Sequence, residues 1–230
     1  MICVLSSLEL YNDDVPRSAP VNMALDEIFW RTATNPRLRF YRWDHPAISF
    51  GYFGCYSDVA SYANEWEIVR RCTGGGIVFH GTDLTYALII PSGADGIPQS
   101  PVSVYTFVHQ AVQRALAKSG VCARLVSDSS RSPETQPAVR LPNACFGNPI
   151  RSDVMVADQK VAGAAQRRSR TGLLQQGSIQ NVKLPPDFQD QFAAQLAATS
   201  INRTVDPAVI EQATGLAAVK YATKEWLLRV

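Results

Sequence analysis

The chain has 230 residues, with 22 Lys and Arg against 20 Asp and Glu, a formal net charge of +2, and 46% hydrophobic residues. This length is enough for one well-buried core or two small ones, and the composition is that of an ordinary globular protein. The small net charge excludes a strongly basic protein whose charge by itself would indicate a nucleic-acid partner.

Five scattered cysteines, Cys3, Cys55, Cys72, Cys122 and Cys145, contain no Cys-x-x-Cys pair. An odd number without paired spacing argues against a disulfide framework or a metal site, and favours a reducing compartment. The N-terminus has no basic region before its short apolar run, and the longest apolar runs are too short to span a membrane. We therefore expect a cytoplasmic protein without a membrane partner.

In the N-terminal half the pattern predicts strands with two helices among them. Residues 8–11 suit a short strand and 16–20 a loop, and Asn22 is the expected N-cap of a helix that ends at Asn35-Pro36. The segments that follow are predicted from alternation and glycine breaks. They are strands over 38–43 and 47–52, a short helix over 57–66, and strands over 67–71, 77–80 and 84–91.

In the C-terminal half, residues 101–120 form the clearest amphipathic helix, because apolar side chains recur at intervals of three and four until Gly120. The polar, proline-bearing segment 127–143 predicts a long loop. Two apolar runs, 153–157 and 160–165, are joined by a tight polar connection. Helices are expected over 188–199 and 207–216.

No internal repeat and no Gly- or Ser-rich linker divides the chain, and strands and helices alternate without a regular βαβ rhythm. We therefore expect one domain over residues 1–230. Its fold class is α/β, with a mixed, largely antiparallel sheet and helices packed on it.

The segment 70–76, Arg-Arg-Cys-Thr-Gly-Gly-Gly, is a candidate ligand loop. It lacks the Lys-Ser/Thr of a phosphate-binding Walker loop and the spacing of a dinucleotide fingerprint. A plain hairpin turn is the alternative, but three glycines cost roughly 0.5–1 kcal/mol each relative to alanine, which favours close approach of a ligand to the backbone. Arg70 and Arg71 add cations that suit a phosphate-bearing carrier or nucleotide. His80, at the end of the next strand, is by spacing alone more typical of a structural or surface histidine.

Cys145 and Lys160 suit acyl-transfer chemistry. Cys145 lies in a loop context ahead of Phe-Gly-Asn-Pro, whereas the other cysteines lie in or beside apolar segments, as small buried side chains do. Lys160 precedes the small residues of segment 161–165, whose close packing would desolvate the lysine and favour acid–base use. A nearby cation would make the thiol a thiolate. An inert cysteine and a solvent-facing strand lysine are the alternatives.

With these residues together, the chain resembles the lipoate/octanoate members of the biotin–lipoate protein ligase and transferase family. The resemblance runs from residue 22 to residue 179, and its parts are NMALDE (22–27), RFYRWDHPAISFGYF (39–53), RRCTGGGIVFH (70–80), DLTYALIIP (83–91), KVAGAAQRR (160–168) and GLLQQGSI (172–179). It implies an α/β domain related to the catalytic core of class II synthetases. It also implies that the glycine loop, residues 71–76, lines an acyl-chain tunnel and that Lys160 contacts the activated acyl group.

The family has two branches that differ in how the acyl group is activated. ATP-dependent ligases make an acyl-adenylate, whereas a cysteine-using branch takes the acyl group from a thioester or an acylated carrier domain. That branch has its nucleophile in a C-F-x-x-P context ahead of the lysine, as Cys145 has. The resemblance therefore implies a catalytic pair, Cys145 and Lys160, with no required cofactor and no metal. ATP and magnesium belong only to the ligase alternative.

The resemblance also implies a set of substrate-binding residues: Arg70, Arg71, Thr73, Gly74, Gly75, Gly76, His80, Gly163, Ala165 and Gln166. Three departures from the family pattern limit what the resemblance implies about the substrate and the activity. Cys55 stands where the family often has glutamine, the turn Asp158-Gln159 lacks the usual glycine, and the separate C-terminal ligase domain is missing. The last departure leans away from a self-sufficient ATP-dependent ligase.

The hypothesis is an acyltransferase that moves an octanoyl or lipoyl group from acyl-carrier protein to the lysine of a lipoyl carrier domain, in a 2-oxoacid dehydrogenase E2 or the glycine cleavage H protein. The alternatives are an ATP-dependent lipoate–protein ligase and transfer between two carrier domains. A non-catalytic acyl- or nucleic-acid-binding module is the rival of another class, with Arg167, Arg168 and Arg170 as its contact. Those arginines lack interleaved aromatics, so we expect no nucleic acid, and a monomer.

Overall fold

The computed structural model describes residues 5–98, 100–127 and 149–229. The strands in chain order are β1 (Leu5–Arg17), β2 (Arg37–Trp43), β3 (Ala47–Phe50), β4 (Glu67–Arg70), β5 (Val78–His80), β6 (Leu84–Pro91), β7 (Ala123–Leu125), β8 (Val154–Val156), β9 (Gln159–Ser169), β10 (Gly172–Ile179) and β11 (Ala197–Arg203). They form an eight-stranded sheet in the order β11-β1-β2-β6-β10-β9-β8-β7 and a three-stranded sheet in the order β4-β3-β5.

The expected α/β class with a mixed, largely antiparallel sheet is confirmed. Strand β1 runs parallel to both of its neighbours, β2 and β11. From β2 across β6, β10, β9 and β8 to β7, every neighbouring pair is antiparallel. In the small sheet β3 is parallel to β4 and antiparallel to β5.

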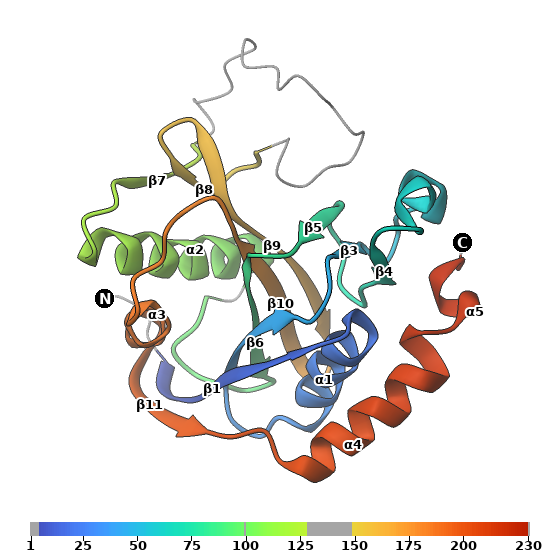
Figure 1. Cartoon of the computed structure of the whole chain (residues 1–230). Helices are drawn as coiled ribbons and strands as arrows, with labels where there is room; N and C mark the ends of the chain where they lie inside the picture. Colours follow the sequence, from blue (N-terminus) through green and yellow to red (C-terminus); the bar gives the residue numbers. More distant parts are fainter. Residues whose placement is uncertain (1–4, 99, 128–148, 230) are drawn as a thin grey trace.

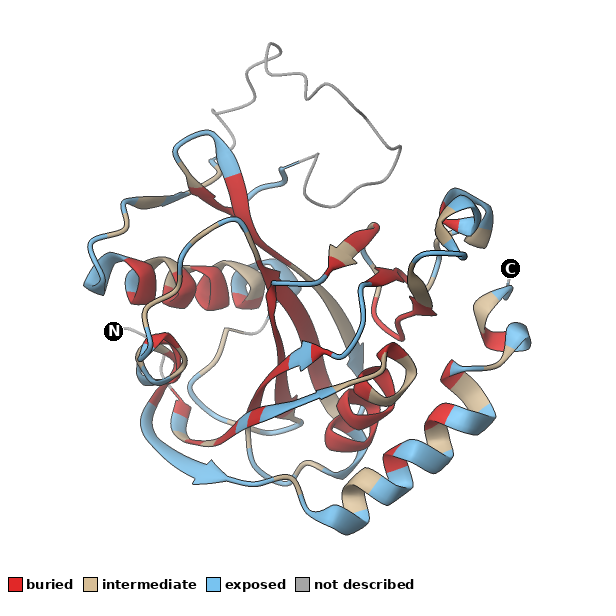
Figure 2. Cartoon of the chain, in the orientation of Figure 1, coloured by how far each residue is buried: buried red, intermediate tan, exposed pale blue. Residues whose placement is uncertain are grey.

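The helices cover both faces of the large sheet (Figure 1). Their bounds are α1 (Ala19–Thr32), α2 (Pro101–Lys118), α3 (Phe188–Leu196), α4 (Pro207–Leu216) and α5 (Lys224–Leu227), with short helical turns η1 (Tyr56–Asp58), η2 (Ala60–Tyr62) and η4 (Ala217–Tyr221). One hydrophobic core lies under α2 and α3, and a second lies under α1, α4 and η4. Figure 2 shows the sheet as a largely buried layer between them.

Strand β6 shows why two separate cores form. Leu88 and Ile90 belong to the core under α2, whereas Ala87 and Ile89 belong to the core under α1. Successive strand side chains point to opposite faces, so a continuous apolar run fits a strand that is buried on both. The run that predicted this strand therefore also places it at the centre of the sheet.

Helix α1 begins earlier than the sequence predicted. Its N-cap is Ser18, with Pro20 in the first turn, where a missing N–H costs little. Asn22 is wrong as the N-cap: it is fully buried in the helix, and its amide donates to the main-chain oxygens of Arg17 and Arg42. The predicted loop over 16–20 is accordingly shared between the end of β1 and the start of α1.

Other predicted elements differ in extent. The helix over 101–120 is confirmed as α2, and Gly120 follows it with φ at +79°. The predicted helix over 188–199 ends at Leu196, because residues from Ala197 pair with β1 as a strand that the sequence analysis missed. The predicted helix over 57–66 is two short turns, and most of the predicted loop over 127–143 lies outside the described residues. Within the described ranges, no helix is long and apolar enough to cross a membrane.

Candidate active site

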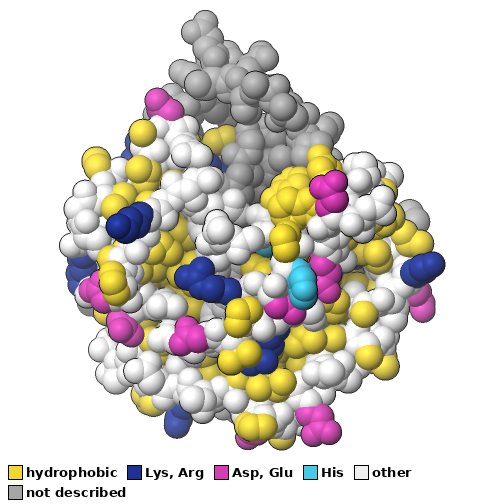
Figure 3. All heavy atoms as spheres, viewed as in Figure 1, with side chains coloured by type: hydrophobic (Ala, Val, Ile, Leu, Met, Phe, Trp, Pro, Cys, Tyr) yellow, Lys and Arg dark blue, Asp and Glu magenta, His cyan; other side chains and the backbone are white. Residues whose placement is uncertain are grey.

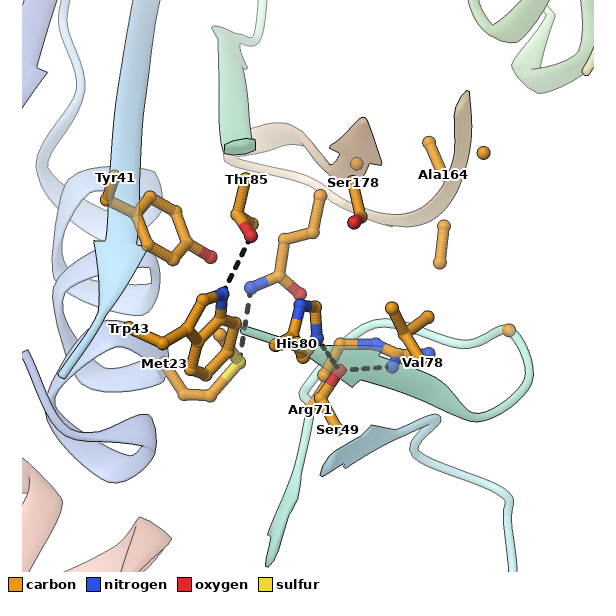
Figure 4. A pocket seen from close by; sticks show the side chains of 15 residues that line it. Met23, Tyr41, Trp43, Ser49, Arg71, Val78, His80, Thr85, Ala164 and Ser178 are labelled. Carbon is orange, nitrogen blue, oxygen red and sulfur yellow. Dashed lines mark hydrogen bonds between the residues drawn. The ribbon is translucent and has the colours of Figure 1, made fainter. Parts of the chain in front are cut away.

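A mostly apolar pocket lies between the two sheets and opens beside the glycine loop (Figure 4). Its empty space, including the part open to solvent, is about 380 Å³. The lining comes from α1, both sheets and the glycine loop. It consists of Met23, Tyr41, Trp43, Ser49, Arg71, Gly75, Val78, His80, Thr85, Gly163, Ala164, Ala165, Gln176, Gly177 and Ser178.

One row of paired residues across the large sheet forms part of the pocket wall. Tyr41 pairs with Thr85, Thr85 with Ser178, and Ser178 with Gly163. Directly opposed residues in antiparallel strands point to the same face, so the row places the small residues Thr85, Ser178 and Gly163 beside Tyr41 in the pocket wall. Gly163 and Ala165, two of the expected substrate-binding residues, both line the pocket.

The glycine loop forms the opposite wall and is held by Arg71. The Arg71 guanidinium donates to the carbonyl oxygens of Gly74 and Gly76, at 2.9 and 2.8 Å. Gly75 has φ at +85°, and a Cβ added there would lie 2.9 Å from the Cβ of Ala165. Only glycine fits this position without strain, because both the backbone conformation and the facing strand exclude a side chain. Arg71 therefore shapes the loop.

A continuous hydrogen-bonded chain links this loop to the large sheet, and Figure 4 shows its part from Arg71 through Ser49 to His80. Arg71 donates to the Ser49 hydroxyl oxygen at 2.8 Å, Ser49 lies 2.7 Å from His80 Nε2, and His80 Nδ1 lies 2.8 Å from the Asp83 carboxylate. Arginine only donates and the carboxylate only accepts, so the His80 Nδ1–H donates to Asp83 and, when the imidazole is neutral, the Ser49 hydroxyl donates to Nε2. His80 is thus buried in the pocket wall.

Asp83 is the fixed end of this chain. Its carboxylate accepts hydrogen bonds from the hydroxyls of Thr85 and Ser178 and from the backbone N–H of Gly81. Burial acts to raise the pKa of Asp83, but the charge and hydrogen bond of His80, with the bonds from Ser178 and Gly81, lower that pKa below its ordinary value. A carboxylate held in its ionised form fixes the orientation of the His80 ring.

Lys160 lies beside Gly163, which lines the pocket, and is 3% exposed. The expected burial is thereby confirmed. Its ammonium nitrogen lies 2.7 Å from the Asp153 carboxylate, a partner that the sequence argument did not include. The carboxylate and the ammonium group are buried together, so each replaces part of the water that the other loses.

A register shift between β8 and β9 turns Lys160 toward the pocket. Val161 and Ala162 both face the core under α2, and Gly163 lies on the opposite, pocket-facing side. Met155 pairs with Lys160 but Val154 pairs with Ala162, so one extra residue interrupts the alternation. Lys160 is therefore on the same side as Gly163, and a Cβ on that glycine would lie 2.7 Å from the lysine nitrogen.

Several of the other expected site residues do not line the pocket. Arg70 does not line the pocket: its guanidinium donates to five main-chain carbonyl oxygens, those of Tyr52, Gly54, Trp226, Leu227 and Arg229. Thr73 is buried against Gln176, and Gln166 donates to Gln175, so both stand beside the lining. Gly74 flanks the lining, and Gly76 lines a neighbouring hollow with Phe53 and Cys55.

The cysteines divide differently from expectation. Cys72 is buried, as expected, whereas Cys55 and Cys122 are exposed, so that expectation is wrong for the latter two. Cys145, like Cys3, lies outside the described residues. Its role as a nucleophile stays a prediction.

The basic run near the end of β9 is not a uniform solvated turn. Arg167 is half-buried, donates to the carbonyl oxygen of Cys72, and stacks over the rings of Trp30 and Tyr52, whereas Arg168 and Arg170 are exposed. On the face shown in Figure 3, basic side chains are interspersed with acidic and hydrophobic ones. This distribution gives no support to a nucleic-acid contact on that face.

Sequence reasoning missed Ser49, Asp83 and Asp153. Each is a polar residue next to an apolar strand segment, and each is at most 3% exposed. A buried carboxylate almost always has a partner, so Asp153 and Lys160 were candidates for pairing once both were placed on adjoining strands. The register shift that brings them together leaves no signal in the sequence.

Comparison with known proteins gives a consistent result. Residues 18–210 match the family model of the lipoyl protein ligase A/B catalytic domain. An octanoyltransferase LipM of Symbiobacterium thermophilum is 36% identical over 171 residues, covering 71% of this chain and 61% of that protein. The chain spans about three fifths of the length of the curated relatives it matches first.

Solved structures share the fold. Protein Ta0514 of T. acidophilum with bound lipoic acid superposes with a TM-score of 0.74 at 21% identity, covering 97% of this chain and 99% of that one. A lipoate-protein ligase A bound with ATP superposes with a TM-score of 0.71 at 22% identity, covering 96% and 98%. The architecture is therefore that of lipoate-protein ligases.

Proposed function

The chain belongs to the lipoyl protein ligase A/B catalytic domain family, and from that premise we propose that it is an octanoyltransferase. It would move an octanoyl group, or a lipoyl group, from the thioester of an acyl-carrier protein to the lysine of a lipoyl carrier domain, in a 2-oxoacid dehydrogenase E2 or the glycine cleavage H protein. Residues 1–230 would act as a single catalytic domain and as a monomer, without a required cofactor.

The observation that carries this proposal is an apolar pocket with a buried lysine beside Gly163, one of its lining residues. Small residues of β9 and the glycine loop leave a slot that suits a straight acyl chain, and Lys160 lies against Gly163 in the pocket lining. Similarity to the octanoyltransferase LipM of Symbiobacterium thermophilum supports octanoyl as the acyl group and transfer as the reaction.

The proposed reaction has two steps. The Cys145 thiolate attacks the thioester carbonyl carbon, the carbon–sulfur bond of the donor breaks, and the carrier sulfur leaves as a thiolate. The neutral amine of the target lysine then attacks the carbonyl carbon of the acyl-enzyme. The bond to the Cys145 sulfur breaks, an amide forms, the amine gives up one proton to solvent, and the Cys145 thiolate is released. The Lys160 ammonium would stabilise both the thiolate and the oxyanion that develops in each step.

Intact-mass measurement after incubation with octanoyl-carrier protein tests the first step. We expect a covalent octanoyl adduct on the wild-type chain and none on the Cys145→Ala variant. An adduct that persists in Cys145→Ala overturns the assignment of the nucleophile.

Complementation of a strain unable to make or attach lipoate tests the donor. Growth without added lipoate supports octanoyl transfer. Growth only with added lipoate, together with pyrophosphate release from ATP, supports the ligase alternative and overturns the proposal.

A further inference from the structure

The carboxylate of Asp153 is held from three sides. Its Oδ2 lies 2.7 Å from the Lys160 nitrogen and accepts the backbone N–H of Ile150 at 2.7 Å. Its Oδ1 accepts the hydroxyl of Tyr105 at 2.5 Å. Asp153 is fully buried, so these contacts replace the water that would otherwise solvate its charge.

Tyr105 has a defined direction in this group. Its hydroxyl oxygen accepts the backbone N–H of Ala164 at 3.2 Å, on the edge of β9 beyond the end of β8. The hydroxyl proton is therefore directed to Asp153, since the oxygen already receives a donor from the strand. One phenol thus joins helix α2, strand β9 and the carboxylate that pairs with Lys160.

Helix α2 also holds the turn that carries Asp153. His109 Nδ1 lies 2.7 Å from the carbonyl oxygen of Ser152, and Thr106 Oγ1 lies 2.8 Å from the Ser152 hydroxyl. Ser152 has φ at +68°, a conformation that costs a non-glycine residue free energy and persists only where the surroundings hold it. Its neighbour Asp153 is therefore placed by the helix together with Val126, whose N–H donates to the Asp153 carbonyl oxygen and whose carbonyl oxygen accepts the N–H of Ser152.

We propose that Tyr105 and Asp153 are positioning residues for Lys160: the Tyr105 hydroxyl orients the Asp153 carboxylate, and the carboxylate holds the lysine as an ammonium group beside Gly163. The inference rests on the proposed function, in which Lys160 acts at the reacting acyl group. A buried ion pair is a weak source of stability, because both partners lose hydration. Its value here is the fixed position and charge of the lysine.

The titratable groups around this pair, among the described residues, are Tyr105, His109 and Tyr86. Burial lowers the pKa of His109 to about 4, so this ring stays neutral at neutral and alkaline pH. Burial raises the pKa of Tyr86 far above its ordinary value, so this phenol stays neutral as well. A phenylalanine at position 105 removes the phenol that contacts Asp153, so this variant separates the contribution of Tyr105 to the pH profile of transfer from that of the Asp153–Lys160 pair.

The test is the pH dependence of kcat and KM for octanoyl transfer in Asp153→Asn and Tyr105→Phe. Asp153→Asn removes the charge that stabilises the ammonium group, so we expect kcat to fall about 10²-fold and the alkaline limb to move to lower pH. Tyr105→Phe leaves that charge less compensated, so we expect kcat to fall roughly fivefold and the limb to stay or move to higher pH. Opposite shifts would not arise from a general loss of structure.

Tyr221→Phe is the matched control. Tyr221 also donates to a buried carboxylate, that of Glu27 at 2.5 Å, but this carboxylate pairs with Arg31 and Lys220 and not with Lys160. We expect its kcat and its alkaline limb to equal those of the wild type. A Tyr221→Phe profile that matches Tyr105→Phe would overturn the proposal.

Lys160→Ala separates the two levels of the argument. If Lys160→Ala keeps full activity, the role of the lysine in the proposed function fails. If Lys160→Ala is inactive while Asp153→Asn keeps the wild-type kcat and alkaline limb, only the positioning inference fails. If Asp153→Asn does not fold, as judged by circular dichroism, the result for Tyr105→Phe decides alone. A wild-type kcat in Tyr105→Phe overturns the inference. A reduced kcat, with the alkaline limb of the pH profile at the wild-type pH or higher, supports it.

Discussion

Arg70 and Arg71 are neighbours in the sequence, are both buried, and bind different parts of the molecule. Arg70 donates hydrogen bonds to the main-chain oxygens of three residues in the C-terminal segment, defined as residues 217–229. Arg71 donates hydrogen bonds to the glycine loop and to Ser49 in the pocket wall. Successive side chains of an extended chain point in opposite directions, so one doublet serves two regions. Stability and activity should therefore separate between the two arginines.

The largest effect is expected for Arg70→Ala. The substitution leaves five carbonyl oxygens without a charged donor, so we expect the free energy of unfolding to fall by about 3–4 kcal/mol and Tm by roughly 10 °C. Denaturant unfolding measures the loss. Arg70→Lys keeps the charge but not the planar guanidinium group, so its free energy of unfolding should lie between those of the wild type and of Arg70→Ala. The protein that remains folded should keep a near-normal kcat, and a large kcat loss in folded Arg70→Ala would break the contrast.

Arg71→Ala should give the converse result. Without the guanidinium, Gly74 and Gly76 lose the donor that holds the pocket wall, and a displaced wall misplaces the acyl chain. We expect kcat/KM for octanoyl transfer to fall about 10²-fold, because small errors of position are costly to catalysis. The accompanying loss in unfolding free energy should be less than that of Arg70→Ala. Equal destabilisation by the two variants would show that the doublet acts as one structural unit.

The sequence predicted Arg70 and Arg71 as one cationic site because hydrogen-bond acceptors far away in the chain cannot be identified from the sequence. The carbonyl oxygens that Arg70 binds lie up to 159 residues away, and main-chain acceptors carry no side-chain signature. The glycines were more informative, since their cost points to close approach, and Gly75 does face Ala165 closely. Local chemistry thus identified the loop but not which arginine serves it.

The same distinction applies to the fold. Helix α2 was predicted well because its apolar period is internal to the segment. Strand β11 was missed because its partner β1 lies at the other end of the chain and most of its side chains are exposed. The start of α1 was misplaced because Asn22 and Asp26 are buried polar residues that resemble helix-terminal ones, and their partners come from other elements.

Ser49→Ala tests the role of the Arg71 contacts in the pocket wall, with a smaller expected effect than Arg71→Ala. It leaves His80 Nε2 without the serine donor and Arg71 without one acceptor, in a wall where Ser49 is 1% exposed. Each unsatisfied buried group costs about 1–3 kcal/mol, so we expect KM for the octanoyl donor to rise roughly tenfold with a smaller change in kcat. Steady-state kinetics with octanoyl-carrier protein measures this. An unchanged KM would show that the chain from Arg71 to Asp83 does not set the pocket wall.

The smallest effect concerns Glu27, which holds the C-terminal segment by a second route. Its carboxylate accepts hydrogen bonds from Lys220 and Tyr221, and it pairs with Arg31. Burial acts to raise the pKa of Glu27, but the bonds from Lys220 and Tyr221 and the nearby charges lower it below its ordinary value. A carboxyl group whose pKa is lower in the folded state stabilises the fold above its unfolded pKa, and that contribution is lost as pH falls through the folded value.

In Glu27→Gln the free energy of unfolding should therefore decrease less on acidification than in the wild type, by at most about 1 kcal/mol. Its kcat at neutral pH should stay unchanged because Glu27 does not line the pocket. Urea unfolding at a series of acidic pH values measures the slope, with the wild type as reference. If Glu27→Gln instead lowers kcat without flattening the curve, the C-terminal segment acts on the pocket as well as on stability. The two arginines would then serve a single coupled region.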